Sequence, residues 1–130
     1  MNHRSALQKY NQVRAHAQTE GASPHRLIQI LMAGALEKIH LAKGLIERHD
    51  IPEKVRHIDW ALSIIDGLRQ SLDLDKGGEI AKNLESLYDY IQRRIIIANM
   101  ENNPQILDEV ASLLIEIKSA WDAVPEIINK

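Results

Sequence analysis

The chain has 130 residues, 45% of them hydrophobic, and a formal net charge of −2, which suits one domain with an ordinary core. It has no cysteine, so disulfides, thiolate metal sites and cysteine nucleophiles are excluded. Its charge gives no general attraction to nucleic acid or to acidic membranes. No apolar run is long enough to span a membrane, and the first residues lack the apolar stretch of a signal peptide. We therefore expect one cytoplasmic domain over residues 1–130.

The first predicted element is a short amphipathic helix within an N-terminal segment, residues 1–21. Leu7, Tyr10 and Val13 recur at helical spacing and share one side of this helix. A helix this short is not stable alone, and Gly21 follows it as a hinge. The segment therefore either docks permanently on the rest of the chain or is displaced from it. The sequence leaves both open.

Four longer helices are predicted after this segment, over residues 23–49, 52–73, 78–102 and 104–122, with a tail over 123–130. Ser23 before Pro24 is a typical helix start. The serine hydroxyl can accept a hydrogen bond from a backbone N–H of the first turn that has no partner within the helix. Proline lacks a backbone N–H, but at the first helical position that group would form no helical hydrogen bond. Asn103 before Pro104 repeats the pattern. Gly77 and Gly78 are expected to supply positive φ in the turn before the third long helix.

Each long helix carries one apolar stripe at i, i+3, i+4 and i+7. In the third, the expected buried stripe is Ile80, Leu84, Leu87, Tyr88, Ile91, Ile95 and Ala98. Short connections make successive helices antiparallel neighbours. The predicted fold is therefore all-α, an antiparallel up-down-up-down four-helix bundle with a short extra N-terminal helix.

Four large apolar residues lie off these stripes, in two pairs spaced i, i+4. Trp60 and Ile64 form one pair, and Ile96 and Met100 form the other. An exposed pair of this kind either packs beneath a neighbouring segment or forms part of a surface for a partner. Both interpretations stay open.

Metal and phosphate chemistry have little support in the sequence. A di-iron bundle needs two Glu-x-x-His pairs, and only Glu37 with His40 fits. His40 and His57 are the candidates for phosphotransfer, but no phosphate-binding loop accompanies them. We predict no catalytic residue, metal ligand, cofactor or small-molecule substrate, and read the chain as a binding module. A metal or phosphotransfer bundle remains as an alternative.

The stretch Asp75-Lys76-Gly77-Gly78-Glu79-Ile80-Ala81, followed by Leu87-Tyr88-Asp89-Tyr90 and Arg93-Arg94, resembles the signature of the FliS family of flagellin-specific export chaperones. The segments Tyr10–Val13 and Ala22–Ile28, and Trp121 near the end, are also similar to that family. The chain departs from the family pattern at Met32-Ala33, and at Trp60, where a lysine is common.

The resemblance implies a cytoplasmic protein that binds the C-terminal helical region of flagellin. It would prevent premature polymerisation and deliver flagellin to a component of the flagellar type III export gate. The candidate flagellin-binding residues are Leu7, Tyr10, Val13, Trp60, Ile64, Ile96 and Met100. We hypothesise that the N-terminal segment covers part of this surface and moves when flagellin arrives. The alternative is a homodimeric bundle without an export role.

Overall fold

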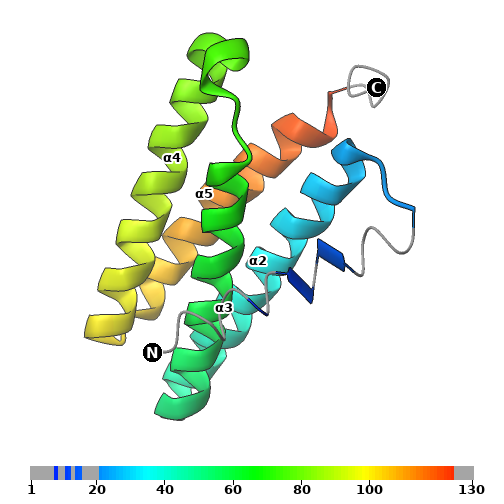
Figure 1. The fold of residues 1–130 in the computed structure, drawn as a ribbon. Coiled ribbons are helices and arrows are strands. Elements are labelled where there is room, and N and C mark those ends of the chain that lie inside the picture. The colour runs from blue at the N-terminus through cyan, green and yellow to red at the C-terminus, as the bar shows by residue number, and fades with distance from the viewer. Residues whose placement is uncertain (1–7, 9–10, 13, 16–20, 125–130) are drawn as a thin grey trace.

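The computed structural model describes residues 8, 11–12, 14–15 and 21–124. They form helices α2 (Pro24–Glu47), α3 (Ile51–Gln70), α4 (Leu74–Glu101) and α5 (Pro104–Asp122). Both α2 and α4 pack against α3 and α5, so the helices close a ring (Figure 1). The predicted all-α four-helix bundle is confirmed, and the described residues include no strand. The extra N-terminal helix stays a prediction, because most of its segment, with Leu7, Tyr10 and Val13, lies outside the described residues.

The side chain before each helix caps its first turn. Ser23 accepts a hydrogen bond from the Arg26 amide at 3.1 Å, and the side chains of Asp50, Asp73 and Asn103 do the same for α3, α4 and α5. These bonds satisfy amides that have no partner within the helix. Local sequence therefore determines where each helix begins.

The start of α4 differs from the prediction. The helix begins at Leu74 and is kinked at Gly78, whose φ of 55° and ψ of −135° are not helical. Gly78, and not Gly77, has the positive φ that favours glycine. Ile80 is 74% exposed, so its assignment to the core was wrong. Figure 1 shows this kinked start projecting beyond the other described helices at one end of the bundle.

The core is aliphatic and lies along the axis of the bundle. Its fully buried members include Ile39, Ile58, Ile65, Ile91, Ile95, Leu107 and Leu114. Ile64 is also 0% exposed, so the expectation that it lies on an exposed face was wrong. The reason is the close approach of α2, where a Cβ built on Gly34 would lie 3.6 Å from Cδ1 of Ile64. Since α3 packs against two helices, it buries a wider face than one stripe.

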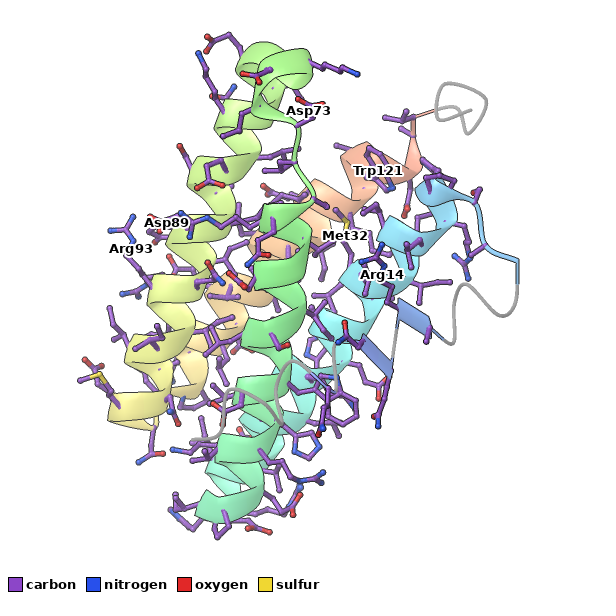
Figure 2. All side chains as sticks on the ribbon, viewed as in Figure 1. Arg14, Met32, Asp73, Asp89, Arg93 and Trp121 are labelled. Carbon is purple, nitrogen blue, oxygen red and sulfur yellow. The ribbon has the colours of Figure 1, made fainter. Side chains whose placement is uncertain are left out.

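His25 at the start of α2 bonds to Trp121 at the end of α5, which Figure 2 labels. Nε2 of His25 donates to the backbone oxygen of Trp121 at 2.9 Å, and Nε1 of Trp121 donates to the backbone oxygen of His25 at 3.0 Å. The two rings stack, with centroids 4.8 Å apart. His25 Nε2 and Trp121 Nε1 therefore both have acceptors although His25 is only 5% exposed. The pair holds the first and last described helices side by side.

Candidate partner-binding groove

A groove runs along the outer surface of α2, with α3 on one side and a residue of α5 at its edge. The residues that line it are Arg26, Gln29, Ile30, Ala33, Gly34, Glu37, Lys38, Trp60, Ile64 and Lys118. Its floor is apolar, with Ile30 from α2 and Trp60 and Ile64 from α3. Ala33 and Gly34 present almost no side chain, which is why the surface of α2 is hollow here. The apolar floor and small residues allow another backbone to come close.

Trp60 is the largest residue of the groove floor and is half-buried against the core. The Lys38 ammonium lies 3.9 Å from the centroid of the Trp60 ring, which is a cation–π contact. This contact joins α2 to α3 across the groove and places a positive charge above an aromatic face. The predicted pair of Trp60 and Ile64 is thus brought into one site, with Trp60 accessible and Ile64 beneath it.

The rim of the groove is mainly basic. Arg26, Lys38 and Lys118 contribute three cations, and Glu37 contributes one carboxylate. Nζ of Lys118 is 2.8 Å from Oδ2 of Asp122 just outside the groove, and this bond holds the pKa of the Asp122 carboxyl below its usual value.

Arg26 is the rim cation with the fewest internal contacts. Its Nη1 donates to Oε1 of Gln29 at 3.3 Å, and it pairs with no carboxylate in the described part of the chain. Lys38, by contrast, lies 3.4 Å from Glu37, its neighbour in sequence. The guanidinium of Arg26 is therefore the most available charge on the rim.

Ile96 and Met100 lie outside this groove, which includes no residue of α4. They are 47% and 76% exposed, in agreement with their expected position on the outer face of the helix. The structure therefore separates the predicted residues into a groove with Trp60 and Ile64 and a second apolar area, Ile96 and Met100, on α4. Leu7, Tyr10 and Val13 lie outside the described residues.

The groove residues of α2 and α5 were not predicted from the sequence. Arg26, Ile30, Ala33 and Glu37 recur at helical spacing on the side of α2 away from the core, and this pattern could have been recognised. Lys118 could not, because only the packing of α5 against α2 brings it to the groove.

The seam between α3 and α4 has a different construction. Nε of Arg69 donates to Oε1 of Glu85 at 2.7 Å, and its Nη1 donates to Asp89 and Gln92 at 3.2 and 2.9 Å. Asp89 also pairs with Arg93 at 3.0 Å, the i, i+4 pair visible on α4 in Figure 2. One guanidinium thus joins the two helices by several bonds.

At the other end of this seam lies Lys54, which is only 3% exposed. Its Nζ donates to the backbone oxygen of Asn99 at 3.1 Å and to Oδ1 of Asn102 at 2.7 Å. Asn102 ends α4 with a φ of 51°. Burial lowers the pKa of the Lys54 amine, and the two oxygens at the helix end compensate the charge. Lys54 therefore fixes the end of α4 against the start of α3.

Within the described ranges, no three histidine, aspartate or glutamate side chains gather as a metal site would require. Among the described helices, none combines the length and the apolarity needed to cross a membrane.

The sequence matches the model of one protein family, described as Flagellar protein FliS, over residues 6–127. The flagellar secretion chaperone FliSB of Pseudomonas aeruginosa is 50% identical over 119 residues, which are 92% of this chain and 94% of the relative. The flagellar secretion chaperones FliS of Vibrio cholerae and Salmonella typhimurium are 45% and 41% identical, covering 94% and 92% of this chain and 90% of each relative. The chain therefore belongs to the FliS family, a family of flagellar secretion chaperones rather than of enzymes.

Proposed function

We propose that this protein acts in the cytoplasm, where it binds the C-terminal helical region of flagellin and prevents its premature polymerisation. It then delivers flagellin to a component of the flagellar type III export apparatus. The relatives named flagellar secretion chaperones support this assignment. The basic first part of the chain, with a net charge of +4 over residues 1–49, is our candidate surface for the export component.

The observation that carries the proposal is the groove on α2. An amphipathic helix binds such a groove by placing apolar anchors on its floor. Trp60 offers the large aromatic surface that dominates binding energy in many interfaces. Ile64 is buried, so it supports the floor from below rather than offering a large contact area. A client that polymerises through the apolar faces of its own amphipathic helices cannot polymerise while the groove covers those faces.

A client that contacts both apolar areas must wrap around the bundle, because the groove and the pair Ile96 and Met100 lie on different helices. A segment that folds as it binds spends part of its contact energy on ordering, so it needs a large surface. Two separated areas meet that need better than one. We propose that Leu7, Tyr10 and Val13 cover part of the surface in the free protein and yield it to flagellin.

Titration of the purified chain with the C-terminal region of its flagellin tests the proposal. Light scattering coupled to size exclusion should give a one-to-one complex, and circular dichroism should show added helix on mixing. Limited proteolysis near residues 19–21 in the same samples should accelerate when flagellin is added. A homodimer that ignores flagellin would contradict the proposal and support the alternative of a self-associating bundle. Iron, zinc or phosphate retained by the pure protein would favour the metal or phosphotransfer alternative.

A further inference from the structure

We infer that the groove on α2 selects an acidic partner, a three-turn amphipathic helix whose apolar anchors are flanked by Asp or Glu. The inference rests on the proposed function, because the helix belongs to the flagellin C-terminal region. It adds a criterion that apolar contact alone does not supply, namely the sign of the charges beside the anchors.

The length of the groove sets the length of the helix. Arg26 and Lys38, the rim cations farthest apart along α2, are separated by twelve residues, or about 18 Å at 1.5 Å per residue. A helix of three turns and three or four anchors at i, i+3, i+4 and i+7 has about that length. Ala33 and Gly34 lie between the two cations, where the docked helix comes closest to α2.

The charges on the rim determine the sign of the charge that the partner must carry. Three cations and one carboxylate surround the floor, and with Asp122, which pairs with Lys118 just outside the groove, the local net charge is +1 while the whole chain carries −2. Charges at the edge of an interface mainly steer association and reject partners of the same sign. Arg26, with only Gln29 as a side-chain partner among the described residues, can accept a carboxylate without breaking an internal ion pair. An acidic helix therefore meets complementary charges at the end of the groove.

The N-terminal segment of the chain is the competing occupant, and its charge has the wrong sign. Residues 1–20 contain three Lys or Arg (Arg4, Lys9 and Arg14) and one acidic residue, Glu20. A basic segment beside a basic rim is repelled, and an acidic client is attracted. The charge pattern thus favours exchange of the segment for the client.

The test measures the affinity of the flagellin C-terminal region for the full-length chain and for Arg26→Glu at low and at high salt. Arg48→Glu is the matched control, because Arg48 lies at the other end of α2, is exposed and does not line the groove. Melting temperatures of both variants verify the fold.

We expect Arg26→Glu to weaken binding about five- to tenfold at low salt, mostly through a slower association rate. The difference from the wild type should shrink at 1 M salt, where the screening length is only about 3 Å. Arg48→Glu should bind like the wild type. Changing the acidic residues of the client to lysine should weaken its binding to the wild type and restore its binding to Arg26→Glu.

Equal binding by the wild type and Arg26→Glu at both salt concentrations would overturn the inference while leaving the proposed function intact. So would equal losses in the two variants. Without flagellin, Arg26→Glu should slow proteolysis near residues 19–21, because the reversed charge no longer repels the basic N-terminal segment. Proteolysis that is unchanged or faster in this variant would contradict the charge argument. A wild-type chain that binds no flagellin would overturn the proposed function and the inference together.

Discussion

The two seams of α3 differ in how they are closed. Toward α4, Arg69 bonds to three side chains, and Lys54 holds the end of the helix. Toward α2, small residues let the backbones approach and bury Ile64, but they leave a groove above it. Among the described residues, the Lys38 ammonium bridges this groove by its contact with the Trp60 ring.

The difference indicates which face can exchange partners. A seam joined by several directional bonds loses them all if a helix moves, so it stays closed. An apolar groove loses little when one apolar segment replaces another, because the contacts are not directional. The α3–α4 seam is therefore scaffold, and the α2–α3 seam is suited to binding. Three predictions test this contrast.

The largest expected effect comes from filling the groove. Ala33 is exposed and lines the groove, so Ala33→Trp should occupy the space of the docked helix. We expect flagellin binding to weaken about a hundredfold, or about 2.7 kcal/mol. The free energy of unfolding should change by less than about 0.5 kcal/mol, since the site is at the surface. Calorimetric titration measures the affinity for flagellin, and urea unfolding measures the stability of the variant.

Two control variants show whether the effect of Ala33→Trp is specific to the groove. Ala120→Trp adds the same side chain to an exposed position of α5 outside the groove and should leave binding unchanged. Arg69→Met opens the ion pairs of the α3–α4 seam and should lower the melting temperature without weakening flagellin binding. If Arg69→Met weakens binding as much as Ala33→Trp does, the contrast between the seams is wrong.

A smaller effect is expected at the buried lysine. Lys54→Met keeps the length of the side chain and leaves the Asn99 and Asn102 oxygens without their charged donor. The free energy of unfolding, measured in urea, should fall by about 2 kcal/mol. Lys82→Met, at an exposed position of α4, is the control and should be nearly neutral. Equal midpoints for the two variants would show that Lys54 does not secure the end of α4.

The smallest effect is a loss of stability in alkali. Burial raises the pKa of Tyr88 to about 12 from an ordinary value near 10. The folded chain thus keeps a proton that the unfolded chain loses. The contribution of the Tyr88 hydroxyl to the free energy of unfolding is therefore complete below pH 10 and disappears as the pH rises toward 12. Between pH 10 and 11 the wild type should lose about 1 kcal/mol more than Tyr88→Phe. Parallel pH profiles for the two proteins, from thermal unfolding, would contradict the assignment.

The sequence predicted the elements because their signals are local. A capping side chain and a proline at the helix start act within four residues, as at Ser23 and Asn103. Apolar spacing likewise identified most of the core. The prediction was wrong at Ile80 and Ile64, where burial depends on whether a neighbouring helix is present at that level.

The candidate site divides in the same way. Trp60, Ile96 and Met100 could be selected from the sequence alone, because large apolar residues off a buried stripe need a reason. Only the tertiary structure showed that Trp60 and Ile64 share a groove and that Ile96 and Met100 do not. The sequence by itself determined the helices, their caps and the FliS resemblance, since these depend on residues close together in the chain. The groove and its basic rim were decided by packing, because Lys118 meets Arg26 and Trp60 only when α5 and α3 close on α2.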